Sequence, residues 1–197
     1  MGKAKLLILF PGVGYHAEKP LLYYAGKLGK KYGYDVVALR YTGFPTDIKG
    51  DLSKREEGYR AALQQTIMEL TDVDFSEYET PVFVSKSIGT VAAARYAKEK
   101  GLPAVQFYLT PLADTFAAAE TGQGMAFSGT KDPLTDTEEI KALCAEKNIP
   151  LHLVQDANHS LETGDVQTDL KIMQFVMHEI EKYMFQTARP VEGVTAP

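Results

Sequence analysis

Ser87 has the surroundings of a nucleophile on a tight turn. An apolar run leads into Ser85-Lys86-Ser87-Ile88-Gly89, and an alanine-rich helical segment follows at once. A serine on a sharp strand-to-helix turn is exposed for attack, and small residues two positions before and after it keep the strand and the helix from clashing. The start of the following helix favours the negative charge that develops in acyl transfer. The segment therefore predicts nucleophilic chemistry at Ser87, although an ordinary loop with two serines would share this pattern.

Two further polar residues follow Ser87, each after a later apolar run. Asp132 stands in the turn 129–133, after the run 125–128, and His159 stands in the loop 156–161, after the run 151–155. A nucleophile on such a turn is served by an acid and then a histidine in this chain order. The histidine would take the serine proton, and the acid would orient the imidazole.

Other side chains compete for these roles. Ser85 is a poor nucleophile, because the turn begins after it and no glycine stands two positions later. Asp114, which follows the run 104–110, is a lesser rival to Asp132 for the role of the acid. Asp156 is too close in sequence to His159 to orient it easily.

The remaining histidines, the lysine beside the nucleophile and the one cysteine have simpler interpretations. His152 lies in the last strand and His178 on the last helix, so we expect structural roles for both, whereas His16 lies in the first loop and is a candidate for substrate contact. Lys86 is expected to bury its stem and to place its amine at a carbonyl or a carboxylate. Cys144 lies in a helical pattern and is expected to be a packed core thiol.

Short apolar runs alternate with helical patterns along the chain. Most runs lack polar alternation, which is typical of parallel strands buried on both faces. Pro20 opens one helical pattern, and Asp136 with Glu139 has the spacing of a capping box before another. We therefore expect an α/β fold with a mostly parallel sheet of about six strands, helices on both faces, three layers and right-handed crossovers. The expected strands are residues 6–10, 35–40, 81–85, 104–110, 125–129 and 151–155.

With these residues on these elements, the chain resembles the α/β-hydrolase superfamily, in a compact form that begins at the fold's usual third strand. The resemblance covers roughly residues 4–185 and rests on the turns 85–89 and 129–133 and on Asn158-His159-Ser160. It implies one domain over 1–197 with the α/β-hydrolase fold, the catalytic residues Ser87, Asp132 and His159, and no cofactor. The tail 187–197 lacks periodicity and is expected to be disordered.

The resemblance also implies the backbone donors of an oxyanion hole. One is the N–H of Ile88, directly after the nucleophile, and the other comes from the loop 11–15, at Val13. Glycines on both sides of Val13 let the backbone approach a substrate oxygen. The chain departs from the family pattern at Pro11-Gly12, where members often have His-Gly, and at Ser85, where the turn usually has glycine. The expected lining of the substrate pocket is Gly12, Gly14, Tyr15 and His16.

Composition restricts the class of protein. The chain has 197 residues, 45% hydrophobic and 24% charged, with a formal net charge of −5, which argues against a general affinity for nucleic acid or anionic membranes. No apolar run approaches membrane-spanning length, and a single cysteine fits a reducing compartment, so we expect a cytoplasmic protein. Neither a metal-ligand cluster nor a glycine-rich phosphate loop is evident, so no metal or cofactor is expected.

The expected function is hydrolysis of a small carboxylic ester or thioester through an acyl-enzyme, with a small-molecule acyl substrate as the partner. The connection 111–124 is too short for a large cap, which favours a shallow, open site. A peptidase or acyltransferase with the same three residues, or a non-catalytic binding module that retains the fold, remain alternatives. The sequence leaves open whether the chain forms a homo-oligomer.

Overall fold

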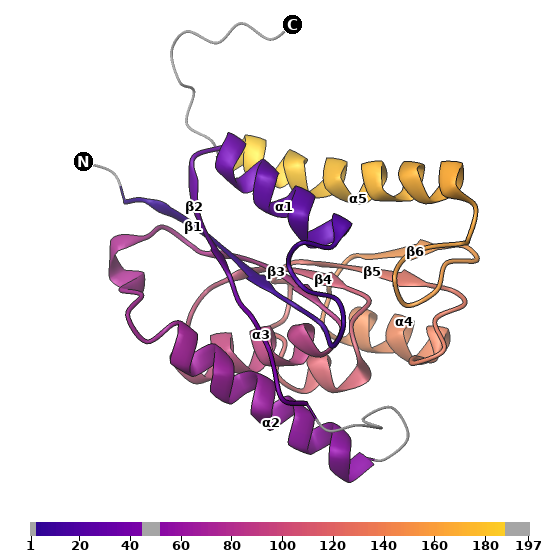
Figure 1. Ribbon diagram of the computed structural model, residues 1–197, viewed down its shortest axis with the longest axis horizontal. Coiled ribbons are helices and arrows are strands. Elements are labelled where there is room, and N and C mark those ends of the chain that lie inside the picture. Colours follow the sequence, from indigo (N-terminus) through magenta and orange to yellow (C-terminus); the bar gives the residue numbers. More distant parts are fainter. Residues whose placement is uncertain (1–2, 45–51, 188–197) are drawn as a thin grey trace, which may run out of the picture.

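The computed structural model describes residues 3–44 and 52–187, and one sheet runs through them (Figure 1). Its six strands are all parallel, in the order β2-β1-β3-β4-β5-β6. The expected α/β fold class is confirmed. The strands are β1 (Lys5–Phe10), β2 (Tyr34–Ala38), β3 (Val82–Lys86), β4 (Val105–Leu109), β5 (Met125–Gly129) and β6 (Leu151–Val154).

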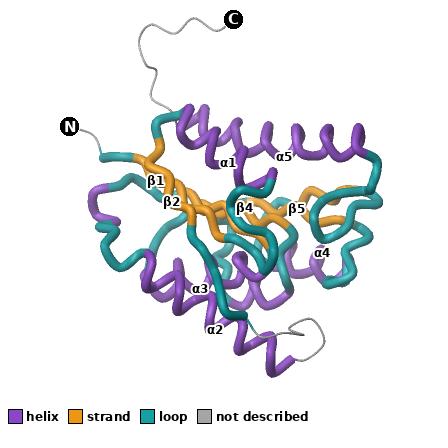
Figure 2. Tube along the Cα trace, viewed as in Figure 1, coloured by secondary structure: helices purple, strands orange, loops and turns teal. Residues whose placement is uncertain are grey.

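Helices cover both faces of this sheet (Figures 1 and 2). On one face, α1 (Pro20–Lys31) lies beside α5 (Val166–Thr187). The other face carries α2 (Leu52–Glu69), α3 (Ile88–Lys100) and α4 (Thr137–Glu146). Two short 3-10 helices, η1 (Phe75–Glu77) and η2 (Ala113–Ala117), complete the described elements. The connection from β4 to β5 holds only η2, in agreement with the expectation that no large cap enters there.

The alternating faces of β1 explain why its sequence is uniformly apolar. Leu7 and Leu9 join the core under α1 and α5, whereas Leu6, Ile8 and Phe10 join the core under α2 and α3. All five side chains are buried, and burying each contributes about 1.5–3 kcal/mol. A strand covered on both faces thus favours apolar residues at every position.

Local signals account for the starts of α1 and α4, and a few boundaries differ from expectation. Pro20 is the first residue of α1, and the Asp136 carboxylate accepts a hydrogen bond from the N–H of Glu139 (2.9 Å), as the capping pattern predicts. β2 ends at Ala38, earlier than expected, because the N–H of Arg40 bonds to the Glu69 carboxylate (2.9 Å) and leaves the sheet. α5 includes Thr187, and the rest of the expected tail, 188–197, lies outside the described residues.

Candidate active site

Ser87 occupies the turn between β3 and α3 in a strained backbone conformation. Its φ of 56° and ψ of −124° are rare for a residue with a side chain, and such a conformation costs about 1–3 kcal/mol. Gly89 makes the turn possible, since a Cβ atom there would lie 2.4 Å from the carbonyl oxygen of Pro11 and 2.5 Å from that of Phe10. The end of β1 thus packs directly against the start of α3, and Ser87 projects at the carboxyl edge of the sheet.

The structure brings Ser87, His159 and Asp132 into one hydrogen-bonded chain. His159 Nε2 lies 2.7 Å from Ser87 Oγ, and His159 Nδ1 lies 2.6 Å from Asp132 Oδ2. The other carboxylate oxygen of Asp132 accepts a hydrogen bond from the N–H of Leu134 (2.9 Å). The Asp132 side chain is 1% exposed and the His159 side chain 20%, so the acid is buried while the imidazole reaches the surface.

A compact turn holds His159 in place. The Asn158 side-chain oxygen accepts hydrogen bonds from the N–H groups of Ser160 (2.7 Å) and Glu162 (3.2 Å), and the N–H of Asn158 bonds to the Glu162 carbonyl (2.8 Å). Gly129 allows this turn to approach β5, because a Cβ atom there would lie 2.1 Å from the Ala157 carbonyl oxygen. The acid turn and the histidine turn are therefore packed backbone against backbone.

Lys86 connects three segments beneath the site, and the sequence analysis anticipated only one of its contacts. Its buried ammonium donates hydrogen bonds to the Thr110 hydroxyl and to the His159 carbonyl oxygen (2.6 Å), and it lies 5.1 Å from the centroid of the Tyr15 ring. The Tyr15 hydroxyl accepts a hydrogen bond from the N–H of Leu21 (3.2 Å) at the start of α1, and burial raises its pKa to about 12. The expectation that the amine meets a carbonyl is confirmed.

Burial dominates the electrostatics of Lys86. The residue is 1% exposed, and loss of hydration lowers the pKa of its ammonium to about 7. The carboxylates of Asp132 and Glu162 act in the opposite direction, since they favour the charged form. A cation near its titration point thus lies directly under the nucleophile turn.

The first loop lies against the nucleophile. Gly12 and Tyr15 exchange backbone hydrogen bonds (3.0 and 3.2 Å) and so close a turn with Val13 and Gly14 at its tip. A Cβ atom at Gly12 would lie 3.1 Å from the Cβ of Ser87, so any larger residue there would require its neighbours to shift by a few tenths of an ångström. Gly14 has a φ of +72°, and Val13 is 49% exposed. The loop thus reaches the nucleophile, while the tip of its turn faces solvent.

The rival acids have other partners. Asp114, on η2, accepts a hydrogen bond from the Tyr59 hydroxyl (3.0 Å). Asp156 forms an ion pair with Lys131 (2.9 Å), which lowers the pKa of its carboxyl group. Neither of these acids makes the contact with an imidazole that Asp132 makes.

None of the other three histidines contacts Ser87 in the part of the chain that the structure describes. The ring of His152 stacks on Phe127 (5.0 Å between centroids) and meets Phe175 edge-on (5.2 Å). His178 is exposed on α5. His16 is also exposed, and it lines a groove that begins at the first loop.

The alternative nucleophiles are buried. Ser85 donates a hydrogen bond to the carbonyl oxygen of Phe107 (3.3 Å) in the neighbouring strand. Burial raises the pKa of the Cys144 thiol to about 12, which removes the thiolate needed for reactivity.

Within residues 3–44 and 52–187, no group of three or more His, Cys, Asp or Glu side chains is arranged to bind a metal ion. None of the helices described is long and apolar enough to cross a membrane.

Comparison with known proteins identifies the fold. No protein-family model matches the sequence, and no curated protein matches it. Solved structures do match, among them a proposed hydrolase of the α/β superfamily from Xanthomonas campestris pv. campestris (14% identity, TM-score 0.65, covering 94% of this chain and 99% of that one). An esterase from Pyrococcus furiosus is 14% identical with a TM-score of 0.66 (95% and 85%). A serine hydrolase without a lid from Xanthomonas campestris is 15% identical with a TM-score of 0.56 (96% and 86%). The chain therefore has the α/β-hydrolase fold, as the resemblance in its sequence implies.

Proposed function

We propose that this chain is a serine hydrolase that cleaves small carboxylic esters or thioesters through an acyl-enzyme on Ser87. The observation that carries the proposal is the pair of contacts from His159, 2.7 Å to Ser87 Oγ and 2.6 Å to Asp132 Oδ2. Contacts of this length on both sides of one imidazole orient it to accept a hydroxyl proton. The names of the similar structures, hydrolases and an esterase, agree with this reaction class.

In the first half-reaction, Ser87 Oγ attacks the carbonyl carbon of the substrate. His159 Nε2 accepts the hydroxyl proton, because the Asp132 carboxylate holds the other ring nitrogen as the N–H form and stabilises the imidazolium that results. The tetrahedral intermediate collapses, His159 returns the proton to the leaving alcohol or thiol, and the acyl group remains on Ser87.

The negative oxygen of that intermediate needs donors, which we assign to the backbone N–H groups of Ile88 and Val13. Ile88 is the first residue of α3, where N–H groups have no partner within the helix. Gly12 places the first loop, which also carries Val13, against Ser87. A water molecule, activated by His159, then releases the acid and restores Ser87.

Covalent labelling tests this proposal directly. A fluorophosphonate probe should label the wild type, and Ser87→Ala should abolish labelling and reduce kcat on p-nitrophenyl butyrate by at least about a thousandfold. Ser85→Ala is the matched control, because Ser85 is a neighbouring but buried serine of β3, and it should still be labelled. Absence of labelling in a folded wild type would favour the non-catalytic binding module.

A further inference from the structure

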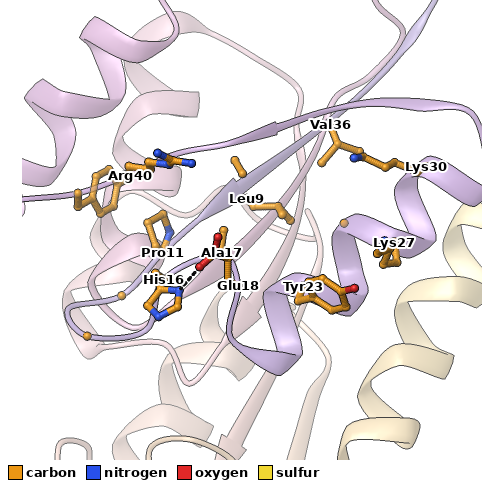
Figure 3. A pocket seen from close by; sticks show the side chains of 15 residues that line it. Leu9, Pro11, His16, Ala17, Glu18, Tyr23, Lys27, Lys30, Val36 and Arg40 are labelled. Carbon is orange, nitrogen blue, oxygen red and sulfur yellow. Dashed lines mark ion pairs between the residues drawn. The ribbon is translucent and has the colours of Figure 1, made fainter.

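A groove begins at the first loop, beside the candidate active site. It has a volume of about 700 Å³, within the range of small-molecule sites, and runs from Gly12 and Gly14 along α1 and the end of β2 (Figure 3). Gly12 lines the groove and also packs against Ser87, since a Cβ atom on Gly12 would lie 3.1 Å from the Cβ of Ser87, so the groove begins beside the nucleophile turn. A substrate group that extends from Ser87 past the first loop would reach this groove.

The groove has an apolar floor and a cationic rim. Its floor includes Leu9 and Val36, and its rim carries Lys27 and Lys30 from α1 and Arg40 from the segment after β2. Figure 3 shows the two lysines and Arg40 on opposite sides of the groove. All three cations are exposed.

Few acids offset this rim. The Glu18 carboxylate lies 3.7 Å from the His16 imidazole, and Glu69 lies beside Arg40, whose N–H it binds. Among the described residues, no carboxylate lies within ion-pair distance of Lys27 or Lys30. The Lys27 ammonium lies 5.2 Å from the centroid of the Tyr23 ring, also a lining residue, which holds the charge at the groove.

A second groove, across the start of α1, has the opposite character. It has a volume of about 240 Å³, and its lining includes the acids Glu162 and Asp169 with the apolar Leu161, Leu170 and Met173. Both grooves are lined in part by the first loop, one by Gly14 and the other by Tyr15. A negatively charged substituent is thus attracted to the first groove and repelled from the second.

We propose that the groove lined by Lys27, Lys30 and Arg40 binds an anionic group of the substrate, a carboxylate, sulfonate or phosphate joined to the scissile ester or thioester by a short apolar chain. This proposal rests on the proposed function. The apolar floor suits the chain, and the rim suits the charge. In a chain of net charge −5, this local excess of cations is a means of selecting anionic acyl compounds.

Two pairs of matched substrates test the proposal and locate the charge. On the acyl side, mono-p-nitrophenyl glutarate is compared with p-nitrophenyl butyrate. On the leaving-group side, S-butyryl 2-mercaptoethanesulfonate is compared with S-butyryl 2-mercaptoethanol. In the double variant Lys27→Gln/Lys30→Gln, the anionic-to-neutral ratio of kcat/KM should fall about tenfold for one of the two pairs, since each exposed charge contributes modestly. Raising the salt concentration should lower the same ratio in the wild type.

The control removes the same charge elsewhere. Lys98→Gln/Lys100→Gln alters two exposed lysines in the last turn of α3, the end of that helix opposite to Ser87, and should change neither ratio by more than about twofold. Unchanged ratios for both pairs in the Lys27→Gln/Lys30→Gln variant would overturn this inference. If the neutral compounds are still cleaved in that case, the proposed hydrolase function is unaffected. A wild type that cleaves none of the four compounds would overturn both.

Discussion

Lys86 should give the stability of this fold a measurable pH dependence. Burial lowers the pKa of its ammonium from 10.5 to about 7. Between these values the unfolded chain holds a proton on this amine that the native chain has released, so the free energy of unfolding rises with pH. The limiting slope for one proton is about 1.4 kcal/mol per pH unit. Half of the native amines are still protonated at pH 7, so the rise from pH 7 to 9 comes to about 2 kcal/mol.

The perturbation that isolates this effect is Lys86→Met, which keeps an unbranched chain of similar length and removes the charge. Urea unfolding followed by far-UV circular dichroism suits a chain without tryptophan. The free energy of unfolding of the wild type minus that of the variant should increase by about 2 kcal/mol from pH 7 to 9. Lys100→Met, at an exposed position, should show a difference that is flat over the same range.

A flat difference for Lys86→Met would refute this reasoning. It would mean that the native amine stays charged, because the Thr110 hydroxyl, the His159 carbonyl and the Tyr15 ring together compensate for its lost hydration. The offset between wild type and variant at any single pH does not bear on the question, since it also contains the lost packing and hydrogen bonds.

Three further predictions address the acid, the turn and the base. Asp132→Asn should lower kcat on p-nitrophenyl butyrate by about ten-thousandfold, because the amide stabilises the wrong tautomer of the imidazole, whereas Asp114→Asn should change kcat little. The reverse result would assign the role of the acid to Asp114, after β4. Gly89→Ala should lower the free energy of unfolding by about 3 kcal/mol, because its Cβ would lie 2.4 Å from a backbone oxygen. Gly101→Ala, which has open space around the new Cβ but a φ of +61°, should lower it by about 1 kcal/mol. Equal losses in urea unfolding would contradict the steric argument. The kcat/KM of the wild type should fall as the pH is lowered, since a protonated His159 cannot act as a base, and a flat profile would contradict that role.

The sheet was predictable because its strands are buried on both faces. Uniform apolar runs marked each strand to within about two residues at either end. Pro20 and Asp136 marked the starts of α1 and α4. The end of β2 was not predictable, because it depends on Glu69, a residue of α2 distant in sequence, capturing the N–H of Arg40. A local pattern carries no information on such a contact.

The convergence of Ser87, Asp132 and His159 was predictable for a different reason, namely their order along the chain. Each stands after a strand of one parallel sheet, so the carboxyl ends of β3, β5 and β6 bring them to one edge. The choice between Asp132 and Asp114 is harder, since both follow strands. It depends on the close approach of the His159 turn to β5, which Gly129 permits.

The position of Lys86 contains a signal that sequence reasoning could use. Side chains alternate along a strand, so Lys86 shares a face with Val82 and Val84, which join the core under α1 and α5. The period of two therefore places this amine on the side of the sheet that carries α1 and α5, against apolar neighbours. The partners that it finds there, the ring of Tyr15 and the carbonyl of His159, come from loops whose paths no pattern in the sequence specifies. The sequence alone therefore predicts that the side chain of Lys86 is buried on this face of the sheet. Its partners can be identified only from the structure, in which the first loop and the His159 loop pack against its ammonium.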